Sequence, residues 1–326
     1  IADKKVSEKI SVEVDEDSWK GSGIEPINGI IPAIALVSAV DGSGYQGTEV
    51  EVPFDVVAPT LSSLKVTIPN ADTIEYDAAT DWLQKAEQGG VIQVGEGNHY
   101  VQGTDYTVTR KVSGQMGKNA GTYKLVVAPK SGGKITGGSV EIDLVVNQKS
   151  MLTGVTVSDP DSLVYNGQPH HPQPTVTFAG NTLQYKVDYT LDWENATNAT
   201  TQESMAVIKV TGKGNFKDTF RKEFTIKPLV ISENKNPTEA GYIKVNRPVD
   251  GEKRPYTGKP IEPEVNIEVN LGTGTKPLGE DGYTVTYDKD HTNVINQVVT
   301  MTITGKGNYD GSITRTFTVV QQELTD

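Results

Sequence analysis

Apolar and polar residues alternate with a period of two along much of the chain. Clear examples are Lys209-Val210-Thr211, Met301-Thr302-Ile303-Thr304 and Phe317-Thr318-Val319. This alternation is typical of antiparallel strands that bury one face and leave the other in solvent. Gly, Pro, Asn and Asp separate the short apolar runs. The sequence therefore predicts an all-β chain of tandem immunoglobulin-like antiparallel β-sandwich modules.

One stretch departs from this pattern. Trp82, Leu83 and Ala86 would share one face of a helix, and Gly89-Gly90 follows as a stop signal. We therefore expect one short helix near residues 79–88. Trp82 has no counterpart elsewhere in the chain, and we expect it to pack this helix against its sandwich.

Three local signatures recur in a fixed order along the chain. The first is an aromatic-x-Gly turn followed by Pro, which begins at Trp19, Tyr165 and Tyr256, with a degraded copy at Tyr76. The second is an Asp-Tyr-Thr run, sometimes with an inserted Gly, which begins at Asp105, Asp188 and Asp281. The third is a Gly-rich turn, which begins at Gly42, Gly132, Gly212 and Gly305 and reads Gly-Lys-Gly-Asn in the last two copies. Such internal repetition indicates an array of similar modules.

Constant spacing within the copies aligns them in a common register. In every copy an apolar residue of the final strand follows the first Gly of the third signature by twelve residues, at Phe54, Leu144, Phe224 and Phe317. We expect these four residues to occupy the same buried position. The register predicts four modules, at residues 1–58, 59–148, 149–228 and 229–326. The first has a much shorter interval between its aromatic and Gly turns than the last two, so we expect it to be reduced or incomplete.

The third and fourth modules carry the fullest set of motifs: Tyr-x-Gly-x-Pro, Asp-Tyr-Thr-Val, and Gly-Lys-Gly-Asn-Tyr followed by Thr-Phe-Thr-Val. This set resembles the tandem Ig-like repeats of large bacterial cell-surface proteins, above all those of Gram-positive gut and oral bacteria. The resemblance is less complete over the second module and partial over the first. It implies a spacer or adhesive segment of a wall-anchored protein. The family has no catalytic motif to transfer to this chain.

Composition narrows the choice of function. The chain has 326 residues, 35% of them apolar, so each core must be small. A net charge of −12 argues against nucleic acid and against contact with an anionic membrane. Cysteine is absent, which excludes disulfides, thiolate metal ligands and thiol nucleophiles.

Residues that could carry chemistry have simpler structural interpretations. His170-His171 fills a slot that holds Ile261-Glu262 in the fourth module, so a metal role is not indicated. Gly-Lys-Gly-Asn lacks the strand-to-helix context of a phosphate loop and is interpreted as a hairpin-type turn. Asp15-Glu16-Asp17 and Asp159-Pro160-Asp161 do not have the spacing of a calcium loop. We predict no catalytic, cofactor-binding or metal-binding residue.

The recurring aromatic residues, Trp19, Tyr76, Tyr165 and Tyr256, are interpreted as structural rather than as a platform for sugars. We expect a non-enzymatic stalk or adhesive segment, extracellular at the cell surface or wall, although no secretion signal or wall anchor is apparent in the sequence. The expected state is a monomer, and the expected partner is an unidentified host protein, matrix protein or glycan. The alternative is a set of accessory, carbohydrate-binding modules of a secreted enzyme.

Overall fold

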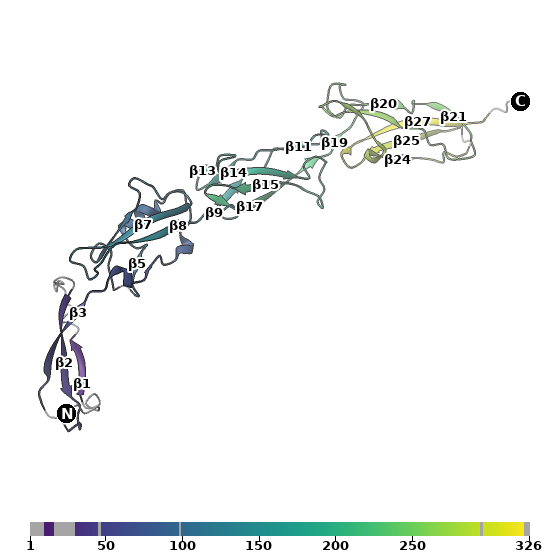
Figure 1. Ribbon diagram of the computed structural model, residues 1–326. Helices are drawn as coiled ribbons and strands as arrows, with labels where there is room; N and C mark the ends of the chain where they lie inside the picture. Colours follow the sequence, from purple (N-terminus) through teal and green to yellow (C-terminus); the bar gives the residue numbers. More distant parts are fainter. Residues whose placement is uncertain (1–9, 16–29, 45–46, 98, 294–295, 323–326) are drawn as a thin grey trace. The chain divides into compact units, whose positions relative to one another are not determined.

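The computed structural model describes residues 10–15, 30–44, 47–97, 99–293 and 296–322. The chain separates into two compact units, residues 1–149 with 214–216, and residues 150–213 with 217–326. Strands dominate both units, as the ribbons in Figure 1 show. The predicted all-β class is confirmed. The finer division into four modules stays a prediction, and the module names below refer to those residue ranges.

The first unit begins with one three-stranded antiparallel sheet, β1 (Ile10–Asp15), β2 (Ile30–Ala39) and β3 (Val50–Val57), with β2 in the centre. Val52 and Phe54 of β3 pair with Ala35 and Ala33 of β2 and share one face with them. Val52 is 42% exposed and Phe54 is 37% exposed. The described residues of the first module form this single sheet, which has no second layer of strands.

The prediction of a buried Phe54 is therefore wrong. The strand pattern and the spacing of twelve residues are present, but the described residues of this short module contain no strands that would form an opposing sheet. Trp19, the other residue predicted to have a structural role here, lies outside the described residues.

The rest of the first unit folds around one core. Its elements are two 3₁₀ turns, η2 (Leu61–Ser63) and η3 (Ala71–Thr73), the helix α2 (Trp82–Gln88), and the strands β4 (Val66–Thr67), β5 (Gln93–Val94), β6 (Tyr106–Arg110), β7 (Gly121–Pro129), β8 (Val140–Val146) and β9 (Lys149–Ser150), the last at the unit boundary. β6, β7 and β8 form an antiparallel meander, and β4 pairs with β5. Leu144 of β8 is fully buried in this core, together with Leu83 and Ala86 of α2. The predicted short helix is thus confirmed.

The second unit contains the fourth module and all of the third except residues 149 and 214–216. The third has the strands β10 (Val155–Val157), β11 (Leu163–Val164), β12 (Val176–Phe178), β13 (Asn181–Thr182), β14 (Tyr189–Glu194), β15 (Ala206–Gly212), β16 (Phe216–Lys217), β17 (Thr219–Phe224) and β18 (Ile226–Lys227). β14, β15 and β17 repeat the antiparallel meander, and β10, β12 and β13 form a second sheet. Phe224 at the end of β17 is buried, and it pairs with Ala206 of β15.

The fourth module has the strands β19 (Leu229–Val230), β20 (Ile243–Arg247), β21 (Glu252–Pro255), β22 (Asn266–Asn270), β23 (Thr275–Pro277), β24 (Tyr283–Tyr287), β25 (Val298–Gly305), β26 (Tyr309–Asp310) and β27 (Ser312–Val320), and a 3₁₀ turn, η4 (Glu280–Gly282). One sheet has the order β21-β27-β25-β24 and the other β20-β22-β23. Phe317 of β27 is 2% exposed and lies in a core with Ile267 and Val269 of the second sheet. Among the described residues, no helix is long and apolar enough to span a membrane.

The three sequence signatures fall at matching places in these modules. The aromatic-x-Gly turn follows a short strand that runs parallel to the last strand of the module, as in β11 with β18 and β21 with β27. The Asp-Tyr-Thr signature opens the first strand of the meander, β6, β14 or β24. The Gly-rich turn lies between the central and last strands of the meander. The repeat register thus describes real structural equivalence in these modules.

Candidate functional site

The Gly-Lys-Gly-Asn turn of the fourth module contacts the third module through Asn308. The Asn308 Oδ1 atom accepts a hydrogen bond of 2.7 Å from the Ala199 N–H, and Nδ2 donates one of 3.1 Å to Asn198 Oδ1. One amide side chain thus satisfies a backbone donor and a side-chain acceptor in a loop of the neighbouring module. We call this arrangement the turn clasp, formed here by Asn308, Asn198 and Ala199.

An aromatic pair lies beside the turn clasp. The ring of Tyr309 meets that of Tyr165, the first-signature aromatic of the third module, edge to face, with centroids 5.5 Å apart and an interplanar angle of 81°. Burial, together with the proximity of Tyr165 and a hydrogen bond to it, raises the pKa of Tyr309 above its ordinary value. Edge-to-face pairs of this geometry add stability beyond the area that they bury.

Backbone pairing completes the junction within the second unit. β19 runs parallel to β26, and the Leu229 N–H donates to the Asn308 carbonyl oxygen over 2.9 Å. Two residues earlier, the Lys227 carbonyl oxygen accepts from the Tyr165 N–H over 2.9 Å. Only Pro228 separates these two anchored residues. The two modules are therefore joined without a free linker.

The same set of contacts occurs inside the first unit, which includes residues 214–216. Asn215 Oδ1 accepts from the Ala120 N–H over 2.8 Å, and Asn215 Nδ2 donates to Asn119 Oδ1 over 3.1 Å. The rings of Phe216 and Tyr76 meet edge to face at 5.4 Å and 78°. Two copies of one arrangement, built from different residues, indicate that the contacts are a property of the repeat.

The Gly-rich turn of the second module differs at the decisive position. Backbone pairing aligns Thr136 with Asp310, since the Leu61 N–H donates to the Thr136 carbonyl oxygen over 2.8 Å as the Ile231 N–H does to that of Asp310. Lys134 therefore occupies the slot of Asn215 and Asn308, one residue earlier than counting from Gly132 predicts. Lys134 is exposed, and its backbone N–H donates to Asp105 Oδ1 over 3.0 Å. The backbone pairing is thus retained here while the amide of the turn clasp is absent.

Sequence reasoning identified the Gly turns and the aromatic residues but missed the turn clasp. The turn was interpreted as a local hairpin, whereas Asn308 pairs with Asn198, 110 residues away. An Asn-Ala pair precedes the central strand in both the second and third modules, at Asn119-Ala120 and Asn198-Ala199. This recurrence was the available signal.

The Asp of the second signature has a structural role. The Asp105 side chain accepts from the Val101 N–H over 2.8 Å, and that of Asp188 accepts from the Gln184 N–H over 2.8 Å, each four residues earlier in the chain. Asp105 is only 2% exposed. Each carboxylate thus closes the loop that leads into the meander.

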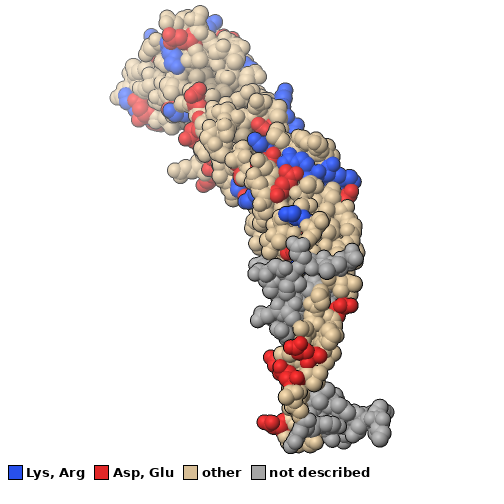
Figure 2. Space-filling model, turned by 90° about the vertical axis from the view of Figure 1, so that its left-hand side faces the viewer, with Lys and Arg blue, Asp and Glu red and all other residues tan. Residues whose placement is uncertain are grey.

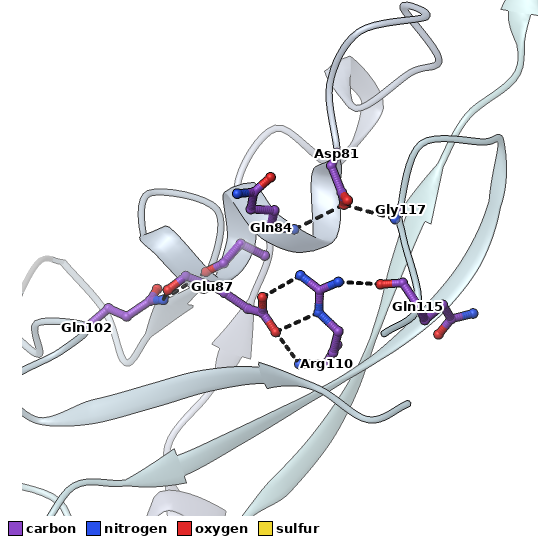
Figure 3. Close-up of polar contacts among 8 residues, drawn as sticks. Asp81, Gln84, Glu87, Gln102, Arg110, Gln115 and Gly117 are labelled. Atoms are coloured by element: carbon purple, nitrogen blue, oxygen red, sulfur yellow. Dashed lines mark hydrogen bonds and ion pairs between the residues drawn. The ribbon is translucent and has the colours of Figure 1, made fainter. Parts of the chain in front are cut away.

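The helix α2 is held by a polar cluster shown in Figure 3. Asp81 caps its first turn by accepting from the Gln84 N–H over 3.2 Å, and it also accepts from the Gly117 N–H over 2.9 Å. The Glu87 carboxylate receives the Arg110 guanidinium in a two-point ion pair, with contacts of 2.9 and 2.6 Å. These hydrogen bonds with Arg110, offset in part by burial, hold the pKa of Glu87 below its ordinary value.

The two carboxylates of this cluster are paired within the fold. Burial tends to raise the pKa of Asp81, but the hydrogen bonds from Gly117 and Gln84 outweigh it and hold that pKa below its ordinary value. The Trp82 indole N–H donates to the Glu75 carbonyl oxygen over 3.1 Å, and the ring packs against the core. The cluster fixes a helix on its sandwich and presents no group poised for proton transfer.

A polar hollow of about 320 Å³ lies in the third module, beside the rings of Trp193 and His171. These rings are tilted against each other with centroids 4.6 Å apart. Asn195 and Ser204 also line the hollow. An aromatic face beside amide and hydroxyl groups is a surface that a small polar ligand such as a sugar could contact.

The other candidate residues are dispersed. Asp159 pairs with Lys222 over 2.6 Å and its side chain is 85% exposed, and His291 stacks on Tyr287 with centroids 4.1 Å apart. Residues 16 and 17 of the first acidic run lie outside the described residues. Within the described part of the chain, no three His, Asp or Glu side chains gather in a way that could hold a metal ion.

Charge is distributed unevenly over the surface. Figure 2 shows acidic and basic side chains interspersed over the larger modules. Lys124 and Asp143 form an ion pair between the adjacent strands β7 and β8, and Lys111, directly after β6, pairs with Glu141 of β8. The described segments 10–15, 30–44 and 47–57 contain acidic residues but no Lys or Arg. The first sheet therefore presents no cationic surface to an anionic partner.

No protein family model matches the chain, and no curated protein does. Among solved structures, the chain is similar to domains EC3–6 of protocadherin gammaB7, with 11% identity over 96% of this chain and 93% of that chain, at a TM-score of 0.20. It is also similar to domains EC1–4 of Drosophila N-cadherin, with 8% identity over 97% of this chain and 92% of that chain, at a TM-score of 0.21. At these scores the likeness carries no argument about function, and the fold assignment rests on the strands described above.

Proposed function

We propose that this chain is a non-enzymatic segment of a bacterial cell-surface protein, in which tandem modules space or display a binding region outside the cell. The observation that carries the proposal is the junction between the third and fourth modules. Pro228 alone separates two residues that are anchored by backbone hydrogen bonds, and the turn clasp fastens a side chain across the same junction. A spacer needs joints of this kind, which hold neighbouring modules in one arrangement.

Several features of composition support an extracellular spacer. Flexible linkers are rich in Gly and Ser, whereas the junctions here contain Pro59 and Pro228. The Pro ring fixes its own φ and restricts the residue before it to extended conformations. Small cores and a negative surface also favour a solvated module over a catalytic domain with a deep cleft.

The proposal can be tested by distance measurements between spin labels on the full chain. Because the protein has no cysteine, Thr156→Cys and Thr284→Cys would give two unique labelling sites, on exposed strand positions of the third and fourth modules. We expect a single narrow distance distribution. Adding Asn308→Ala should broaden it, because the turn clasp is lost while the backbone pairing remains. Adding Thr286→Ala, an exposed change in β24, is the matched control and should leave it narrow.

A broad distribution in the protein without Asn308→Ala would contradict a spacing role. A panel of hydrolase substrates provides a second test. Turnover that a single substitution abolishes would contradict the non-enzymatic assignment, whatever the distance distribution shows.

The hollow beside Trp193 favours a second candidate, an adhesive or accessory module that binds carbohydrate. Aromatic faces beside amides and hydroxyls suit the apolar faces and hydroxyl groups of sugars. A glycan array with the full chain, repeated with Trp193→Ala, tests this candidate. Binding that Trp193→Ala removes would support it, and an array without signal would leave the spacing role as the better account.

A further inference from the structure

The first-signature turn of the fourth module has the same local structure as the two turns that are covered by a junction. The Tyr256 N–H donates to the Val320 carbonyl oxygen over 2.8 Å, as the Tyr165 N–H does to Lys227 and the Tyr76 N–H to Asn147, both over 2.9 Å. The backbone two residues further on is left-handed in all three copies, with φ of 74° at Gly258, 74° at Gly167 and 68° at Ala78. The three turns are therefore equivalent.

The three aromatic rings differ in what covers them. Tyr76 meets Phe216, and Tyr165 meets Tyr309. Tyr256 is 39% exposed, and no aromatic ring in the described part of the chain lies against it. The fourth module thus presents, in solvent, the aromatic that is covered by a Gly-Lys-Gly-Asn-aromatic turn in the other two cases.

A recurring buried anchor comes directly after the short strand that opens the next module, β9 or β19. Met151 lies four residues after Asn147 and Ile231 four residues after Lys227; Met151 is 0% and Ile231 2% exposed. Their N–H groups donate to Lys217 and Asp310 respectively, each over 2.8 Å. In the sequence, Leu324 lies four residues after Val320. Residues 321–324 thus match the start of a further module by the same register, although residues 323–326 are outside the described part of the chain.

We propose that the surface around Tyr256 and Gly258 is the acceptor of a third junction. Its partner is a further module of the same repeat, continuous with residues 321–324, whose Gly-x-Gly-Asn-aromatic turn covers Tyr256. The inference rests on the proposed spacing function, which requires an array of modules. It adds the chemistry of the partner, namely an aromatic ring for Tyr256.

The test is a chain extended by one module. Residues 229–326 are appended after Gln321, so that the appended Leu229 and Ile231 follow Val320 at the spacing of the known junction. Tyr256→Phe in the appended copy leaves a single Tyr256 to be mapped. Nitration of individual tyrosines by tetranitromethane, mapped by mass spectrometry, reports ring exposure. We expect Tyr256 to react readily in the 326-residue chain and to become as slow as Tyr165 in the extended chain. Tyr185, which is 37% exposed in the third module, is the internal reference and should react equally in both.

A matched variant separates specific docking from simple crowding. Asn308→Ala made only in the appended copy should restore much of the reactivity of Tyr256, whereas Lys306→Ala in the same turn should not. Unchanged nitration of Tyr256 in an extended chain with a folded appended module would overturn the proposal. Failure of the appended module to fold at this position would count against it equally, because the same module folds at the known junction. Neither result depends on the spin-label or substrate tests of the proposed function.

Discussion

The first and fourth modules end in strands of the same alternating pattern, but the equivalent aromatic residues of these strands differ in burial. Phe317 is 2% exposed because the sheet β20-β22-β23 lies over it, and Ile267 and Val269 of that sheet share its core. Phe54, in the same slot, is 37% exposed on a single sheet. The comparison teaches that a repeat slot determines the direction of a side chain, whereas a second sheet determines its burial.

Large-to-small substitutions at these two positions should give the largest difference in stability. Phe317→Ala should destabilise the fourth module by about 3–5 kcal/mol, because it leaves a cavity in a closed core. Phe54→Ala should cost less than about 1 kcal/mol, as is usual for an exposed side chain. Hydrogen exchange of the amides in β25 and β2 would report each module separately. Equal effects at the two positions would show that the first sheet is covered in solution.

The next comparison is between Gly-rich turns with and without the Asn side chain of the turn clasp. Asn308→Ala should weaken the coupling of the third and fourth modules by about 1–2 kcal/mol, since it removes two hydrogen bonds and leaves the Ala199 N–H unpaired. Calorimetry should then resolve their unfolding into more widely separated transitions. Lys134→Ala, the same slot in the second module, should change stability by less than about 0.5 kcal/mol. An effect of Lys134→Ala as large as that of Asn308→Ala would refute the distinction.

Two substitutions at the left-handed position of the first-signature turns should change stability in opposite directions. Ala78 adopts a left-handed φ of 68°. This conformation is strained for a residue with a Cβ atom but not for Gly. Ala78→Gly should stabilise the second module by about 0.5–1 kcal/mol, and Gly258→Ala should destabilise the fourth by about 1 kcal/mol. Urea unfolding followed by hydrogen exchange would measure both. Changes of the same sign would contradict the equivalence of the turns.

The smallest expected effect concerns the Glu87–Arg110 ion pair of the second module. The pKa of Glu87 is lowered by Arg110, so the charged carboxylate stabilises the folded state. That contribution, about 0.5–1 kcal/mol for a partly exposed pair, is present at pH 7 and is lost as the pH falls through and below the ordinary value of 4.5. Urea unfolding of Glu87→Gln should differ from that of the unmodified chain at pH 7 and converge with it near pH 3. A difference that persists in acid would point to packing instead of charge.

Much of each module could be predicted from the sequence. Alternation of Thr with Phe317 and Val319 identifies a half-buried strand, and Trp82, Leu83 and Ala86 identify the helix, because both patterns are local. The exposure of Phe54 could not be predicted in this way, since it depends on whether a second sheet covers β3, and the described residues of the first module form one sheet only. A spacing measured along the chain contains no information about an opposing layer.

Local sequence patterns could not predict the turn clasp, for a different reason. Asn308 and Asn198 are distant in sequence, and each lies in a loop that looks ordinary by itself. Only the register of the repeat places them on opposite sides of one junction. Asp105 and Asp188 illustrate the intermediate case, because their recurrence was visible while their hydrogen bonds to residues four positions earlier were not.

The third and fourth modules each carry both halves of the junction, a Tyr-x-Gly turn and a Gly-Lys-Gly-Asn turn, at different loops of the same sandwich. An interface made of two unlike halves is heterologous, and each added module presents a new free half for the next one. Duplication or deletion of the third module in the gene would therefore leave each joint beside it with both halves. The number of modules can then change in evolution without the appearance of a new contact surface.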